Sequence, residues 1–274
     1  MSSLKQTLVL PKTSEKSPHF DFSFIYVAFK RSIAIILFLA LWEALPRFGV
    51  VDAAFLPPLS VVLVAGWNLI LSGQLLIHLE ASLLRSITGF LVAIVVAIPL
   101  GLLIGWYGKF SDYINPLLEL FRNTAALALL PVFILFLGIG EASKIALIIY
   151  ACTWPILLNT ISGVRNVDPL LIKSARTMDL SPISLFRKVI LPASVPTIFV
   201  GIRMAGAFSV LILVAAEMVG AKAGLGYLIN YAQYNFQIPE MFFGIICITV
   251  LGLIFNYALL LIEKRLTGWK SSTR

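Results

Sequence analysis

Lys173-Ser-Ala-Arg-Thr-Met-Asp-Leu-Ser-Pro-Ile-Ser-Leu-Phe-Arg-Lys-Val-Ile-Leu-Pro192 is a polar and basic stretch between two long apolar runs. The whole chain of 274 residues is 59% hydrophobic and only 12% charged, and its mean hydropathy is +0.97. A soluble domain normally carries about 25% charged residues. The composition therefore predicts an all-α, polytopic membrane protein in which this stretch is a loop that faces water.

Six apolar runs are long enough to cross a hydrocarbon core of about 30 Å as helices that rise about 1.5 Å per residue. In chain order, the predicted spans cover residues 32–50, 83–106, 114–137, 145–163, 195–219 and 242–262. This division gives an N-terminal tail (1–31), a transmembrane domain (32–262) that contains the loop 165–193, and a C-terminal tail (263–274).

Two segments depart from this regular pattern. Residues 55–72 include an apolar run that is too short to span a bilayer, so we expect an interfacial or re-entrant segment there. The third span is less regular, because it contains prolines and charged residues. Within it, Glu119 and Arg122 are three residues apart on one helix face, and a mutual ion pair is the first explanation for both.

The positions of the basic residues predict the orientation of the chain. With the N-terminus inside, most of the 21 Lys and Arg residues fall in inner segments, and the outer segments hold only Arg47, Arg85, Lys144 and Lys222. Short cytoplasmic loops of membrane proteins carry such an excess of positive charge. We therefore expect both termini and the loop 165–193 to be cytoplasmic. The formal charge of +8 then requires no nucleic-acid partner.

The loop carries two helix-start signals. Asp168-Pro169 and Ser181-Pro182 each combine an N-cap residue with proline at the first helical position. They predict two short helices hinged at residues 179–181, the first of which ends near Met178. Such an exposed basic hairpin can insert into a groove on another protein. The alternative is that its charge only sets the topology of the chain.

The spacing within the loop is similar to that in permeases of ATP-binding-cassette (ABC) importers. Their cytoplasmic loop has the pattern E-A-A, three residues, G, nine residues, I-x-L-P. This chain has Lys173-Ser174-Ala175, three residues, Asp179, nine residues, and then Val189-Ile190-Leu191-Pro192. It departs from the pattern at Lys173, Ser174 and Asp179.

The resemblance extends over roughly residues 55–269 and points to the branch of these permeases that serves sulfonates, taurine and nitrate. The segments that carry it are Phe55-Leu-Pro-Pro, Ala81-Ser-Leu-Leu-Arg-Ser-Ile-Thr-Gly-Phe, Leu130-Pro-Val-Phe-Ile-Leu-Phe-Leu-Gly-Ile-Gly-Glu, Leu213-Val-Ala-Ala-Glu-Met-Val and Gly224-Leu-Gly-Tyr-Leu-Ile. One departure is Phe121-Arg-Asn-Thr-Ala-Ala-Leu-Ala, which lacks the prolines that usually follow this arginine.

The resemblance implies a type I ABC importer permease fold and a multi-pass subunit of the bacterial cytoplasmic (inner) membrane. Two copies would form the path, two cytoplasmic ATPase subunits would hold ATP and Mg²⁺, and an external or periplasmic binding protein would deliver the substrate. No cofactor is expected on this chain itself. The residues implied to bind the ATPase are Lys173, Ser174, Ala175, Arg176, Thr177, Met178, Asp179, Leu180 and Ser181.

Within that set, Ala175 and Met178 are expected on the docking side, and Arg176 is expected to pair with acidic groups of the ATPase. Val189, Leu191 and Pro192 would transmit the movement of the loop into the fifth span.

Charged residues inside the spans are costly and usually face protein or water. Arg85, Arg203 and Glu217 are therefore candidates for the translocation path or a gate. For Arg85 and Glu217 the alternative is a structural ion pair or an interfacial position, and for Arg203 it is a side chain that extends to the membrane surface.

The sequence favours a transporter subunit over an enzyme. It has no Walker-type loop, G-x-S-x-G or H-E-x-x-H motif. Cys152 and Cys247 indicate neither a disulfide nor a metal site. We expect a small anion as substrate, an aliphatic sulfonate or taurine first, with nitrate, bicarbonate or a vitamin precursor as alternatives. The remaining rival is an ion-coupled secondary transporter, whose paired broken helices and coupling acids we do not identify here.

Overall fold

The computed structural model describes the backbone of residues 22–267 and the side chains of residues 33–108 and 110–266. Every regular element in this part of the chain is helical. In order, the helices are α1 (Phe22–Arg47), α2 (Leu59–Leu71), α3 (Gln74–Trp106), α4 (Gly108–Asn123), η1 (Ala126–Leu129), α5 (Leu130–Leu137), α6 (Glu141–Arg165), α7 (Pro169–Thr177), α8 (Pro182–Leu185), η2 (Phe186–Ile190), α9 (Leu191–Met218), α10 (Leu225–Tyr234) and α11 (Ile238–Thr267).

The predicted tails lie mostly outside the described residues. Helix α1 nevertheless begins at Phe22 rather than at the predicted residue 32, and α11 continues to Thr267 rather than ending at residue 262.

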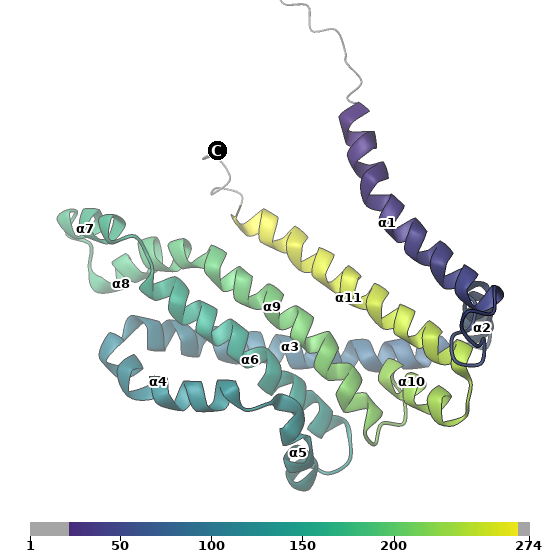
Figure 1. Cartoon of the computed structure of the whole chain (residues 1–274). Coiled ribbons are helices and arrows are strands. Elements are labelled where there is room, and N and C mark those ends of the chain that lie inside the picture. The colour runs from purple at the N-terminus through teal and green to yellow at the C-terminus, as the bar shows by residue number, and fades with distance from the viewer. Residues whose placement is uncertain (1–21, 268–274) are drawn as a thin grey trace, which may run out of the picture.

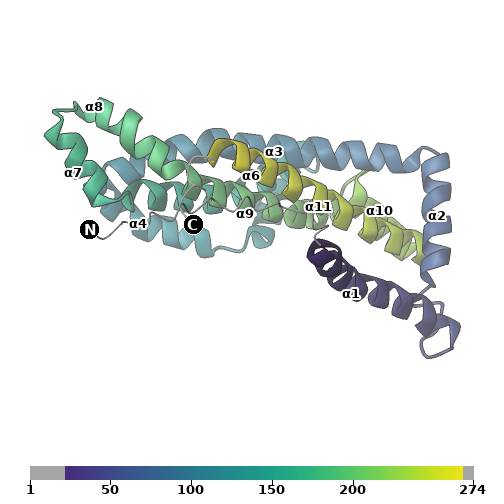
Figure 2. The ribbon, with the colours of Figure 1, turned by 90° about the horizontal axis from the view of Figure 1, so that it is seen from above.

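Helices α3, α6 and α9 pack side by side and form the centre of the molecule (Figures 1 and 2). Glycines allow the backbones to approach closely. A Cβ atom on Gly89 would lie 2.6 Å from Ile148, and one on Gly101 would lie 2.6 Å from Thr160. Small residues at helix contacts are typical of membrane proteins, because dispersion contacts replace the hydrophobic effect there.

The outer surface of the bundle is apolar. Leu37, Val95 and Leu253 are 64%, 71% and 53% exposed, and many other large apolar side chains are exposed in the same way. Soluble monomers rarely expose apolar surface on this scale. Contact with lipid hydrocarbon accounts for this exposed apolar surface.

Four helices are long and apolar enough to cross a membrane: residues 74–106, 141–165, 182–218 and 238–266. They contain the predicted second, fourth and sixth spans and all but the last residue of the predicted fifth span. The predicted third span is a broken pair, because α4 and the η1–α5 segment are bent by 85°. Thr124 and Ala125 are extended at the break, with ψ of 119° at both residues, although neither is a proline. Residues 32–47 of the predicted first span lie on α1, which is not among the helices that meet this criterion within the described residues, and residues 48–50 follow its end.

Helix α2 lies crosswise to α3 at the end of the bundle that also holds α10 (Figure 2). Ser60 donates from its backbone N to Glu43 at 2.9 Å, and the Trp42 indole donates to the Pro57 carbonyl at 3.1 Å. Gly66 lies against the ring of Phe243. A short helix that lies crosswise to α3 (Figure 2) favours the interfacial alternative for residues 55–72.

Helices α7 and α8 form a hairpin at the opposite end of the bundle (Figures 1 and 2). The bundle thus has an α7–α8 end and an α2–α10 end.

Candidate functional site

Both helices of the α7–α8 hairpin begin at the N-cap residues that the sequence predicts. The Asp168 carboxylate accepts a hydrogen bond from the backbone N of Leu170 at 2.8 Å, and the Ser181 hydroxyl accepts one from the backbone N of Ser184 at 3.4 Å. Pro169 and Pro182 occupy the first helical positions. The predicted pair of short helices is confirmed.

The turn between the two helices is a Schellman motif with Asp179 in the left-handed region, at φ 51°. The backbone N of Asp179 donates to Arg176 O at 3.1 Å, and that of Leu180 donates to Ala175 O at 3.4 Å. This position usually holds glycine, which adopts positive φ without strain. The geometry thus explains why the family pattern has glycine where this chain has Asp179.

A small apolar core holds the hairpin on the bundle. Ala175, Leu185 and Ile190 are buried together with Val164 and Val167 from the α6 end and the loop that follows it. The expectation that Ala175 lies on the docking side is therefore wrong: its side chain is 4% exposed and faces this core.

The other predicted docking residues surround the turn. Lys173, Ser174, Arg176, Thr177, Met178, Asp179 and Ser181 are exposed, and Leu180 is half-buried. Met178 is 76% exposed and Ile183 is 73% exposed, so large apolar side chains stand beside the basic ones. The tip of the hairpin combines positive charge with an apolar contact surface.

The hairpin continues directly into α9. Residues 186–190 form a single π-helical turn between α8 and α9. Val189 and Leu191 are half-buried and Pro192 is exposed, whereas Ile190 belongs to the hairpin core. Consecutive helical turns therefore connect the tip to the long helix.

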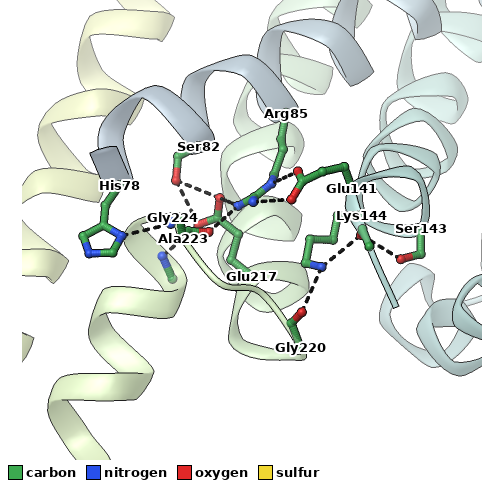
Figure 3. Close-up of polar contacts among 12 residues, drawn as sticks. His78, Ser82, Arg85, Glu141, Ser143, Lys144, Glu217, Gly220, Ala223 and Gly224 are labelled. Atoms are coloured by element: carbon green, nitrogen blue, oxygen red, sulfur yellow. Dashed lines mark hydrogen bonds and ion pairs between the residues drawn. The ribbon is translucent and has the colours of Figure 1, made fainter. Parts of the chain in front are cut away.

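Arg85 and Glu217 meet in a buried cluster near the α2–α10 end (Figure 3). The Arg85 guanidinium donates to Glu217 Oε1 at 2.7 Å and to the Ala223 carbonyl at 2.6 Å. It also binds the two carboxylate oxygens of Glu141, one of them from Nη2 at 2.7 Å. Arg85 is 4% exposed and Glu217 is 1% exposed. The alternative of a structural ion pair is what the geometry supports.

The loop before α10 closes over the Glu217 carboxylate. Gly226 donates its backbone N to Glu217 at 2.8 Å, and Ser82 donates its hydroxyl to the same carboxylate while accepting from the backbone N of Leu225. A Cβ on Gly224, where φ is 129°, would lie 2.3 Å from the Glu217 carboxyl carbon. The sequence predicts only a turn at these glycines.

Lys144 completes the cluster by donating to the carbonyl oxygens of Gly140 and Gly220. The positive charges of Arg85 and Lys144 balance the negative charges of Glu141 and Glu217. Their contacts join α3, α6, α9 and the loop before α10. Because Arg85 and Glu217 are buried and fully engaged, neither contacts a passing substrate in this conformation.

Arg203 is also engaged with a carboxylate, at 3.2 Å from Glu263 of α11. The expected pair of Glu119 and Arg122 is wrong: among the described residues, neither side chain lies within 4.0 Å of an opposite charge. The described residues also contain no cluster of three His, Cys, Asp or Glu side chains suited to a metal ion.

Residues 97–268 match the family described as binding-protein-dependent transport system inner membrane component. A Bacillus subtilis (strain 168) permease named for aliphatic sulfonates is 36% identical over 234 residues, which cover 85% of each chain. The taurine transport system permease protein TauC of Escherichia coli (strain K12) is 31% identical, over 84% of this chain and 86% of that protein. The nitrate import permease protein NrtB of Leptolyngbya laminosa is 33% identical over 82% of each.

A solved structure of the MetNI methionine ABC transporter in inward-facing conformations contains a chain of the same fold. Its TM-score is 0.61 at 19% identity, over 71% of this chain and 96% of that chain. The chain therefore belongs to the family of inner membrane components of binding-protein-dependent transport systems, the non-enzymatic permease subunits of ABC importers, and has the type I fold.

Proposed function

We propose that this chain is the membrane-spanning subunit of an ATP-driven importer of a small anion in the bacterial cytoplasmic membrane. Two copies form the path, and two cytoplasmic ATPase subunits bind ATP and Mg²⁺. An external binding protein delivers the substrate. The α7–α8 hairpin is the surface on which each ATPase acts.

The observation that supports this proposal is that the hairpin has an exposed tip and a buried core. Its tip is exposed and basic, with Met178 76% exposed, while its underside is fixed by a buried core. A docking element must expose its contact surface to the partner. It must also be held firmly by its own core, so that a movement of the partner displaces the attached helix and does not only deform the hairpin. The π-helical link at residues 186–190 leads from this tip into α9 without a break.

Residue roles follow from this geometry. Arg176 and Lys173 supply positive charge for acidic groups of the ATPase, and Met178 supplies an apolar anchor. Val189, Leu191 and Pro192 carry the displacement into α9.

The proposed substrate is an aliphatic sulfonate or taurine. Relatives named for aliphatic sulfonates and taurine cover most of this chain at 36% and 31% identity, which supports a substrate with a sulfonate head group. Nitrate is the second candidate, because a permease named for nitrate is 33% identical.

Met178→Asp tests the coupling role. The substitution places a carboxylate on the docking surface without touching the hairpin core, so the chain should insert and fold as before. We expect the assembled complex to lose ATP-driven uptake at least tenfold. Leu170→Asp, which replaces another exposed apolar side chain (69% exposed) at the start of α7, is a matched control for added charge away from the tip.

The readouts are co-purification with the ATPase and vanadate-sensitive uptake in proteoliposomes. Normal uptake by the Met178→Asp complex would mean that the ATPase docks elsewhere.

A further inference from the structure

Among the described residues, Arg122 is the arginine within the predicted spans that has no carboxylate partner. Arg85 binds two carboxylates, and Arg203 binds Glu263. Arg122 is exposed at the end of α4, and no carboxylate among the described residues lies within ion-pair distance of it. A charge at bilayer depth without such a partner must face water or another polar group.

The polar face of α4 leads to this arginine. Asp112, Asn115, Glu119 and Arg122 follow one another at spacings of three, four and three residues, so they lie on one side of the helix. All four are exposed, and Asp112 at the start of the row pairs with Arg165 at 3.5 Å. Lipid hydrocarbon cannot solvate such a row of side chains. The face therefore borders an aqueous space or a second copy of the chain.

The row ends at a pocket in the bend between α4 and α5. The pocket has a volume of about 530 Å³, within the range of small-molecule sites, and Arg122, Asn159, Trp154, Met204 and Phe208 line it. Trp154 lies near the middle of α6, and Met204 and Phe208 lie near the middle of α9. The pocket is thus at mid-depth in the bundle.

Contacts to α6 hold the arginine at the pocket. The Tyr150 hydroxyl donates to the Phe121 carbonyl at 2.6 Å. The rings of Phe121 and Trp154 stack with centroids 6.0 Å apart. Both contacts fix the last turn of α4, from which Arg122 extends. Irregular backbone at membrane depth, such as Thr124 and Ala125 here, occurs where a cavity or protein satisfies it.

We propose that this pocket binds the substrate during its passage, and that it recognises an organic monoanion of the sulfonate type. The Arg122 guanidinium binds two oxygens of the head group in its planar fork. The Asn159 amide nitrogen donates one hydrogen to the Pro155 carbonyl at 2.8 Å, and its second N–H contacts the head group. The organic substituent lies against Trp154, Met204 and Phe208. The inference rests on the proposed import function and names the residues that select its substrate.

Glu119 has a defined role in this arrangement. It lies one turn before Arg122 on the same face, so its charge opposes the bound anion. A transport site must release its ligand as well as bind it. Glu119→Gln should therefore tighten anion binding by roughly two- to fivefold and slow release.

The test compares Arg122→Ala, Arg122→Lys and Asn159→Ala in the complete complex with its ATPase and binding protein. We expect Arg122→Ala to reduce uptake of labelled ethanesulfonate roughly 10- to 100-fold, because a hydrogen-bonded charge is lost. ATP hydrolysis stimulated by the loaded binding protein should stay within twofold of the wild type. Arg265→Ala, which removes an exposed arginine at the end of α11, is the matched control.

Added guanidinium ions should partly restore uptake by Arg122→Ala, which a purely structural role of Arg122 would not predict. Phe208→Ala should reduce uptake of butanesulfonate more than that of methanesulfonate, because only the longer chain reaches the apolar wall.

Three outcomes would overturn the inference. Ethanesulfonate uptake by Arg122→Ala at the wild-type rate would leave the import function intact and remove the site. Cross-linking of an Asn115→Cys variant to its second copy in every transport state would assign the polar face to the dimer interface. Import of only neutral compounds by the wild-type complex would refute the anion function and the site together.

Discussion

Arg85→Met leaves a carboxylate buried without its cation, and the structure allows the cost to be estimated. Glu217 is 1% exposed and would keep only hydrogen bonds from Ser82 and Gly226. Removing one partner of a buried ion pair costs about 3–5 kcal/mol. The other partner, Glu141, has a side chain that is 62% exposed and contributes little, because water solvates it.

A loss of this size should lower the midpoint of thermal denaturation by roughly 6–20 °C. The assay is the fraction of detergent-solubilised chain that stays monodisperse after heating. Glu141→Gln is the control, with an expected loss below about 1 kcal/mol. The double variant Arg85→Met/Glu217→Gln removes the unpaired charge and should recover more than half of the lost stability.

Two results would refute this reasoning. A drop of less than about 2 °C for Arg85→Met would mean that the cluster does not hold the helices together. A double variant no more stable than Arg85→Met would mean that the buried charge of Glu217 is not the source of the cost.

Ala175→Glu should open the hairpin, because it places a carboxylate in the hairpin core at a cost of several kcal/mol. The neighbouring change Ser174→Glu, at an exposed position, should leave the hairpin closed. Protease cleavage of the loop should therefore be faster in Ala175→Glu than in Ser174→Glu. Asp179→Gly should relieve the left-handed strain and slow amide exchange at Leu180 by up to about fivefold, corresponding to about 1 kcal/mol, and faster exchange would contradict the role of the turn. Gly101→Leu should separate α3 from α6, since a Cβ there already lies 2.6 Å from Thr160, and an unchanged midpoint of thermal denaturation would count against close packing.

Local signals predict the hairpin well. Asp168 and Ser181 act within their own turns, so the residue types and the prolines that follow them suffice. The positive φ of Asp179 follows the same local logic once the glycine of the family pattern is considered. The direction of Ala175 was not predictable in this way, because it depends on Leu185 and Ile190, which fold back beneath it.

Contacts between distant residues explain the other differences. Arg85 and Glu217 are 132 residues apart, and Glu141 comes from a third helix, so the sequence offers the ion pair only as one alternative. The break at Thr124 contains no proline, and the contacts of Phe121 with Tyr150 and Trp154 hold the chain there instead. Glu119 and Arg122 share one face of α4, so their spacing alone suggests an ion pair, whereas in the structure Arg122 lines the pocket at the end of that helix.

The central claim is that ATP hydrolysis by a partner drives anion import through this chain. The direct measurement is uptake of labelled ethanesulfonate into proteoliposomes that contain the chain and its ATPase, with the binding protein outside and ATP inside. We predict accumulation against a gradient only when the chain, the ATPase, the binding protein and ATP are all present. Uptake by the chain alone, driven by a proton or sodium gradient, would contradict the claim.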